Sequence, residues 1–300
     1  TRKKLHNEIG NALEDLHKDN LNEYHAILAE HFMAGGSYDK AAEYCRLAAR
    51  KAEQTASVSD AITYTQKRVS CLEKLPQTED VLRKMVDART TLGLYWSQTN
   101  HPLVAKEAVE PVVDLALKLD YKRRISQIYS ILGVCSWWVD EDYTRTNRYF
   151  TDALTIAEEL QDLLSLATAN SYLGIVFSMT CEYEKASYHF GKALDINTAG
   201  NTLWGTAGVK SWRAGWVYDY QGKNDLGYKE TSEAVRIAED SGDIYSKAHG
   251  HTFHGRSCYC KGLLEEAEEH LLAGISFAKR VDDPGAQSAS QLWLGITYLD

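Results

Sequence analysis

Residues 173–193 read LGIVFSMTCEYEKASYHFGKA, and the interpretation of the whole chain follows from this stretch. Apolar residues recur at helical spacing before Thr180 and again after Glu184, and a short polar turn separates the two runs. Apolar residues that recur every three or four positions indicate an amphipathic helix. The sequence therefore predicts a helix over residues 164–180, a turn over residues 180–183 and a second helix over residues 184–196.

The Leu-Gly pair that opens this stretch belongs to a ladder of six glycines spaced 40 or 41 residues apart. The ladder consists of Gly93, Gly133, Gly174, Gly215, Gly255 and Gly295. A glycine in the middle of a helix costs about 1 kcal/mol relative to alanine, so six in register indicate a packing requirement. Antiparallel helices approach to about 8–10 Å where their facing side chains are small. We therefore predict a repeated two-helix hairpin, and the unit around Gly133 needs one extra residue in its turn.

The composition favours helices and excludes several classes of protein. Only four prolines occur in 300 residues, which is few for a chain with many irregular segments. The net charge of −9 argues against a nucleic-acid partner, because phosphate binding needs a concentrated basic face. No run of about 18 apolar residues is present, so no membrane span is predicted. The six cysteines are scattered through helical patterns, which favours reduced thiols and a cytoplasmic protein.

The repeat resembles the tetratricopeptide repeat (TPR). The best match pairs Leu-Gly and a following aromatic on the first helix with alanine, aromatic and alanine on the second. The matching residues are Leu173, Gly174, Phe177, Tyr183, Ala186, Phe190 and Ala193. The common repeat has about 34 residues and a closing proline; here that proline is missing and the unit is about six residues longer, as in the 40-residue class of signalling adaptors and bacterial regulators. The resemblance implies an all-α protein, a right-handed α-solenoid superhelix of antiparallel helical hairpins.

The chain is expected to divide into an irregular N-terminal part, residues 1–77, and a regular array of repeats, residues 78–300, whose last repeat is truncated. In the first part, Gly35-Gly36 is predicted to form the turn of one TPR-like hairpin, and a helix is predicted over residues 58–75. Pro76-Gln77-Thr78 then interrupts the chain before the regular array.

A second resemblance concerns residues 5–14, LHNEIGNALE, and residues 24–32, YHAILAEHF. They resemble the segment that follows the nucleotide-binding module in large bacterial regulators of the AAA-type ATPase and nucleotide-cyclase kind. This resemblance implies that the chain is the repeat region of a larger signalling protein. The apolar helix predicted over residues 287–300 lacks a covering second helix, so we expect self-association through this end.

His251, His254 and Cys258 fall on one face of a predicted helix and could in principle reach one zinc ion. The same positions in other units carry core residues, so packing is favoured over metal binding. No phosphate-binding glycine loop and no nucleophile motif occurs, so neither a cofactor nor a catalytic residue is predicted. The basic run Lys122-Arg123-Arg124 is interpreted as a solvated helix face, with a binding role as the alternative.

A partner is expected on the concave face of the superhelix, which the first helix of each hairpin lines. This groove should be lined by the side chains three residues before each ladder glycine and by those one and four residues after it. Aromatic residues and arginine carry most interface energy, and they concentrate at these positions. The predicted groove consists of Trp137, Trp138, Trp212, Arg213, Trp216, Asp219, Tyr220, Arg256 and Tyr259.

The leading functional hypothesis is a non-catalytic scaffold that binds a protein or peptide within a larger regulatory protein. The alternative is a small-molecule sensor domain of a bacterial multidomain regulator, and an enzyme is a distant third. An open aromatic trough would favour a peptide, whereas a closed pocket with converging polar groups would favour a small ligand. The asparagine and lysine residues that TPR domains use to clamp a C-terminal carboxylate are absent from the groove positions, which argues against a chaperone-tail receptor.

Overall fold

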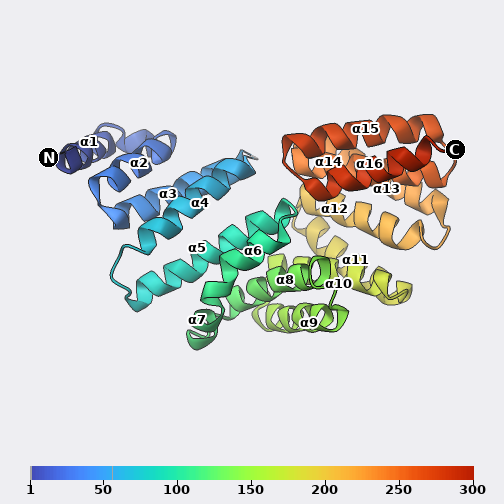
Figure 1. Cartoon of the computed structure of the whole chain (residues 1–300), viewed down its shortest axis with the longest axis horizontal. Coiled ribbons are helices and arrows are strands. Elements are labelled where there is room, and N and C mark those ends of the chain that lie inside the picture. The colour runs from blue at the N-terminus through green and yellow to red at the C-terminus, as the bar shows by residue number, and fades with distance from the viewer. Residues whose placement is uncertain (1, 56) are drawn as a thin grey trace. The chain divides into compact units, whose positions relative to one another are not determined.

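The computed structural model describes residues 2–55 and 57–300, and over these residues it contains sixteen α-helices and no β-strand (Figure 1). Helices adjacent in the chain pack as antiparallel pairs, which confirms the all-α hairpin fold. Residues 1–131 and 132–300 form two compact units, and the boundary between them lies within helix α8. No described helix is both long and apolar enough to cross a membrane.

The first unit contains the N-terminal hairpins, and the domain boundary predicted at residue 77 remains a prediction. Its α-helices are α1 (Arg2–Leu16), α2 (His25–Gly35), α3 (Tyr38–Gln54), α4 (Val58–Leu72), α5 (Glu79–Gln98), α6 (Pro102–Val109), α7 (Val113–Lys118) and the first half of α8 (Lys122–Trp138). Gly36 forms the turn between α2 and α3 with a left-handed φ of 83°, which glycine adopts without steric cost. The predicted break at residues 76–78 separates α4 from α5, and the Thr78 hydroxyl caps α5 by accepting from the Val81 amide.

The second helix of the hairpin around Gly93 is interrupted, which the glycine ladder does not predict. Helix α6 ends at Val109, a 3-10 turn spans Glu110–Val112, and α7 begins at Val113. Pro111 explains the break, because proline has no amide hydrogen and its ring clashes with the preceding helical turn.

The second unit contains the regular hairpins. It comprises the end of α8 and then α9 (Tyr143–Leu160), α10 (Leu163–Met179), α11 (Tyr183–Ala199), α12 (Leu203–Arg213), α13 (Asn224–Ser241), α14 (Ile244–Cys260), α15 (Leu264–Arg280) and α16 (Pro284–Thr297). Helix α12 continues into a π-helical turn, Ala214–Tyr218, which the sequence did not predict. The turn between α8 and α9 is one residue longer than that between α10 and α11, as predicted.

The helices that carry the ladder glycines, called first helices here, form one layer within the second unit. Helix α10 packs against α12, α12 against α14, and α14 against α16. The second helices α11, α13 and α15 each pack between two first helices in the chain order, and no extensive contact joins one of these three to another. The first helices therefore approach one another more closely than the second helices do, which makes their layer the inner one.

The ladder glycines permit close contact between the two helices of a hairpin. A Cβ atom at Gly133 would lie 2.8 Å from the Phe150 ring, and one at Gly174 would lie 2.8 Å from the Phe190 ring. Gly255 approaches Leu271 of α15 in the same way, at 2.6 Å. Gly215, in the π-helical turn, instead faces Phe253 of the following first helix. Gly295 has open space beside it, and self-association through α16 remains a prediction.

Each turn of the regular array contains one residue with a left-handed backbone. Asn100, Glu141, Cys181, Gly222 and Gly262 form one series inside hairpins, and Asp120, Gln161, Asn201, Gly242 and Asp282 form another between hairpins. The members of each series recur every 40 or 41 residues. Only four of these ten residues are Asn or Asp, and three are glycine, so the residue types alone do not mark the positions. The repeat is therefore preserved in the backbone as well as in the core.

Two glycines of one hairpin test the packing argument. Replacing Gly174 with alanine forces the new methyl group against Phe190 and should lower the free energy of unfolding by about 1–3 kcal/mol. Gly191, on α11, has no atom within 4 Å of a Cβ position, so Gly191→Ala should raise it by about 0.5–1 kcal/mol. Urea unfolding of both variants measures the difference, and shifts of the same sign would contradict the packing role of the ladder.

Candidate functional site

The tryptophans are distributed unevenly over the two helical layers. All seven lie on first helices or on the π-helical continuation of one: Trp96, Trp137, Trp138, Trp204, Trp212, Trp216 and Trp293. Second helices contribute phenylalanine to the core, for example Phe150 and Phe190. The indole rings, which combine an apolar face with an N–H donor, therefore lie on the inner layer.

Within the second unit, several of the predicted residues form one continuous chain of ring contacts. The Trp137 and Trp138 rings lie 4.5 Å apart, Trp137 meets Trp216 edge-on at 6.4 Å, and Trp216 stacks on Tyr220 at 6.1 Å. The Trp137 indole N–H also donates to the Met179 sulfur at 3.0 Å. These separations lie in the range in which aromatic pairs attract beyond their buried area.

Arg256 continues the chain. Its guanidinium carbon lies 4.6 Å from the centre of the Tyr220 ring and 4.8 Å from that of Trp293, so the cation is held between two aromatic faces. Trp293 in turn lies 5.6 Å from Tyr259. We call the set Trp137, Trp138, Trp216, Tyr220, Arg256, Trp293 and Tyr259 the aromatic stripe.

The members of the stripe differ in exposure. Trp138 is 52% exposed and Tyr220 57% exposed, Trp216 and Tyr259 are half-buried, and Trp137 and Arg256 are buried. Both exposed residues stand five positions after a ladder glycine. The sequence predicted that the residue three positions before each ladder glycine would face the groove. Ser130, Ser171 and Thr252 occupy this position, and all three are buried. Neighbouring first helices cover these positions; Thr252, for example, hydrogen-bonds Ser290 of α16 at 2.7 Å.

Asp219 lies beneath the stripe. Its carboxylate is almost fully buried, 3.5 Å from the Arg256 Nε, and accepts a hydrogen bond from the Ser257 hydroxyl at 3.1 Å. Burial raises the pKa of Asp219 to about 6, against the opposing effects of the Arg256 charge and the Ser257 hydrogen bond. The Arg256 Nε has no hydrogen-bond partner, so this ion pair is held by charge and by the two aromatic faces.

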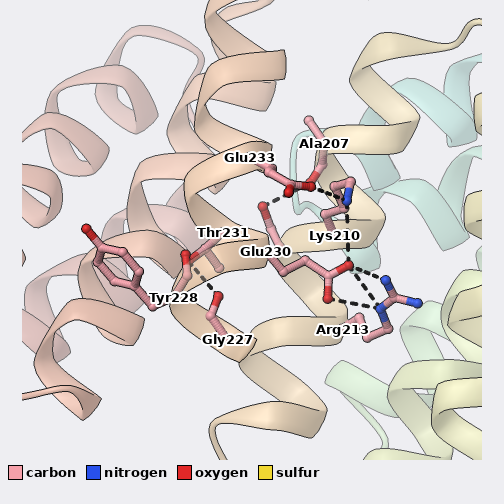
Figure 2. Close-up of polar contacts among 9 residues, drawn as sticks. Ala207, Lys210, Arg213, Gly227, Tyr228, Glu230, Thr231 and Glu233 are labelled. Atoms are coloured by element: carbon pink, nitrogen blue, oxygen red, sulfur yellow. Dashed lines mark hydrogen bonds and ion pairs between the residues drawn. The ribbon is translucent and has the colours of Figure 1, made fainter. Parts of the chain in front are cut away.

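Arg213 and Trp212 belong to neighbouring clusters rather than to the stripe. Figure 2 shows the Arg213 guanidinium forked onto the Glu230 carboxylate of α13, with both Glu230 oxygens 3.1 Å from Nε. Lys210 lies 2.9 Å from Glu233 and 3.8 Å from Glu230 in the same network (Figure 2). Burial lowers the pKa of Arg213, but the hydrogen bonds and charge of Glu230 outweigh it, so the net shift is upward. Trp212 contacts Tyr172 and His249 instead.

The histidine–cysteine helix face divides in two. His251 points to His270 and Glu239, whereas His254 and Cys258 are buried and lie near Glu266 of α15. The donor atoms of His254, Cys258 and Glu266 all lie within 4.8 Å of one another, a spacing that a metal ion could bridge. Burial lowers the pKa of His254 to about 4 and raises that of Cys258 to about 12, so both are neutral near pH 7. The His254 Nδ1 also lies 2.8 Å from the Thr231 hydroxyl of α13, so packing within the scaffold already engages this ring.

Sequence reasoning missed three residues of these clusters. Trp293 lies two positions before Gly295 and so outside the predicted groove register, although its tryptophan on a first helix was a usable signal. Glu230 and Lys210 carry no pattern of their own, because their pairing depends on how α12 packs against α13.

Comparisons with known proteins establish the fold. No known family profile matches the sequence, and no curated protein matches it significantly. Among solved structures, a Rap protein complexed with Competence and Sporulation Factor matches with a TM-score of 0.62 at 15% identity, over 99% of this chain and 91% of that one. The Rap conjugation gene regulator of plasmid pLS20 in complex with the Phr* peptide matches with a TM-score of 0.57 at 16% identity, over 90% and 74%.

A signal transduction ATPase with numerous domains and a tetratricopeptide repeat sensor, from Pyrococcus horikoshii, matches with a TM-score of 0.61 at 15% identity. The alignment covers 99% of this chain but only 43% of that protein. The chain therefore has the helical-repeat fold of TPR-type proteins, an α-solenoid class. At identities this low, the similarity concerns the fold and not the ligand.

The network in Figure 2 predicts unequal effects for two neighbouring glutamates. The Glu230 side chain is 8% exposed, and its removal leaves the half-buried Arg213 without its partner. Glu230→Ala should therefore lower the free energy of unfolding by about 3 kcal/mol. The Glu233 side chain is 43% exposed and shares Lys210, and Glu233→Ala should cost less than about 1 kcal/mol. Equal losses in urea unfolding would show that the Glu230 fork stabilises the hairpin no more than the exposed Glu233 pair does.

The buried carboxyl of Asp219 predicts a pH dependence. Because its pKa is raised to about 6, the folded chain keeps this proton at pH values where the unfolded chain has released it. Ionisation of Asp219 therefore lowers stability as the pH rises from about 4 to about 6, by up to about 3 kcal/mol. Asp219→Asn removes this contribution. The difference in free energy of unfolding, intact protein minus variant, should therefore decrease between about pH 4 and about pH 6. Other titrating groups are common to both proteins, and a difference that is constant with pH would refute the assignment.

Proposed function

We propose that the second unit is a binding scaffold that holds an extended peptide or protein segment along the aromatic stripe. The observation that carries this proposal is the continuous contact chain from Trp138 through Tyr220 and Arg256 to Tyr259, which crosses several first helices. A site that extends over consecutive repeats suits a long, narrow ligand better than a compact one.

The residue types of the stripe support this proposal. Tryptophan, tyrosine and arginine are the side chains that most often dominate binding energy. The two aromatic residues bury large areas with few rotatable bonds, and arginine adds charge-assisted hydrogen bonds and stacking. Trp138 and Tyr220 offer the exposed rings, while Trp137, Trp216 and Arg256 are fixed beneath and beside them. A rigid support of this kind reduces the entropy that an interface residue loses on binding.

The structural neighbours provide independent support for the class of ligand. The pLS20 regulator with a similar fold was solved with the Phr* peptide bound. The Pyrococcus ATPase has its repeats described as a sensor, which agrees with the proposal that this chain is the non-catalytic repeat region of a larger cytoplasmic regulator. The overall negative charge agrees with a partner other than nucleic acid.

Two exposed tyrosines of the same unit provide a matched test. Peptides that bind the intact chain are selected from a random display library, and their affinities for variants are measured by fluorescence anisotropy. Tyr220→Ala removes an exposed ring of the stripe and should weaken binding about tenfold or more. Tyr188, on the second helix α11, is 60% exposed against 57% for Tyr220, and Tyr188→Ala should leave the affinity unchanged.

A second pair separates the stripe from tryptophan exposure in general. Trp138 and Trp204 are each 52% exposed, but only Trp138 makes ring contacts within the stripe. Trp138→Ala should weaken the selected peptides and Trp204→Ala should not. Peptides that tolerate both stripe substitutions, Tyr220→Ala and Trp138→Ala, would refute the proposed site.

A further inference from the structure

A pocket of about 300 Å³ in the first unit is surrounded by arginine side chains. Arg46 and Arg50 come from α3, Arg68 from α4 and Arg124 from the first half of α8. Two carboxylates, Glu53 and Asp87, also line it. The lining therefore carries four positive and two negative groups, and Glu43, which pairs with Arg46 from outside the lining, reduces the positive excess from two charges to one.

Several of these groups already have partners. Asp87 accepts from the Arg124 Nε at 2.6 Å and from the Tyr121 hydroxyl at 2.9 Å. Arg46 is forked onto Glu43, at 3.0 Å and 2.6 Å, and Glu53 accepts from the Tyr95 hydroxyl at 3.3 Å. These contacts fix the walls of the pocket and hold the guanidinium groups of Arg46 and Arg124 in defined orientations.

Arg68 differs from the other arginines of the pocket. The residue is only 9% exposed, and it has no hydrogen bond or ion pair with any described residue. Burial lowers the pKa of Arg68, and the charges of Arg46 and Arg124 add to this effect while Asp87 and Glu43 oppose it. No Arg68 nitrogen is both fully buried and unpaired, so the guanidinium opens onto accessible space, where it can donate to a bound acceptor.

We propose that this pocket binds the phosphate group of a small phosphate monoester, with Arg68 as its central ligand and Arg50 at its mouth. An oxyanion matches the positive excess of the lining, and its oxygens supply the acceptors that Arg68 lacks. Guanidinium groups recognise such oxygens through paired, charge-assisted hydrogen bonds. A volume of about 300 Å³ is at the lower limit for small-molecule sites, so the ligand is a small molecule rather than a peptide segment.

This site is independent of the aromatic stripe. Every lining residue belongs to the first unit, whereas the stripe lies within residues 132–300. The sequence offered only part of the signal, since Arg124 belongs to the basic run whose alternative interpretation was a binding role. The remaining arginines come from α3 and α4, and their convergence with Arg124 depends on how helices distant in sequence pack together.

Isothermal titration calorimetry of the intact 300-residue chain at low ionic strength tests the proposal, with inorganic phosphate and glycerol 2-phosphate as probes. Both should bind saturably, and Arg68→Met should weaken each at least about tenfold. Arg50→Ala alters an exposed side chain, so folding is preserved, and it should weaken the probes severalfold. Arg83→Met changes the net charge equally but lies outside the pocket, where Arg83 pairs with Glu79, and should bind as the intact chain does.

Thermal unfolding gives a second readout that does not depend on heats of binding. In phosphate-free buffer Arg68→Met should be as stable as the intact chain or more so, because it removes an unpaired buried charge. Phosphate should then raise the unfolding temperature of the intact chain and not that of the variant. No saturable binding of either probe would overturn the proposal. Equal weakening by Arg68→Met and Arg83→Met would also overturn it. Succinate, titrated in the same way as a dicarboxylate control, should bind more weakly than both phosphate probes, and a preference for succinate would overturn the proposal as well.

Discussion

The structure depends on the close approach of two antiparallel helices at one glycine per repeat. Where Gly133 and Gly174 lie on the first helix, the rings of Phe150 and Phe190 occupy the space that a methyl group would fill. This contact fixes the distance between the helices of a hairpin and the rotation of the first helix about its axis. The rotation then determines which side chains face the neighbouring repeat and which face solvent, so the surface of the inner layer follows from a constraint in the core.

The aromatic stripe is the main consequence of that constraint in the second unit. Because the first helices pack against one another, positions near each glycine are covered, and Trp138 and Tyr220 emerge five residues after it. Buried polar groups then anchor the layer from beneath. Arg256 pairs with Asp219, and Arg213 pairs with Glu230 of the covering helix. The charged residues that the sequence predicted as ligand contacts thus form ion pairs within the scaffold, and the exposed rings are the contacts that we propose for a partner.

The sequence predicted the hairpins, their 40-residue step and the longer turn after α8, because glycine spacing and apolar periodicity report local packing directly. It did not predict the break at Pro111, although proline's lack of an amide hydrogen is a sufficient cause. The π-helical turn at Ala214–Tyr218 and the left-handed residues Cys181 and Gln161 have no residue signature. Trp293 and Arg68 could not be assigned, because each acquires its role from helices distant in sequence.

The central claim is that the inner layer of the second unit, and not its outer layer, is the binding surface. Hydrogen–deuterium exchange of the intact chain, with and without a display-selected peptide at saturation, tests it most directly. The account predicts added protection in the first helices, at residues 134–138, 214–220 and 256–260, with α9, α11, α13 and α15 unchanged. Protection confined to those second helices would contradict it.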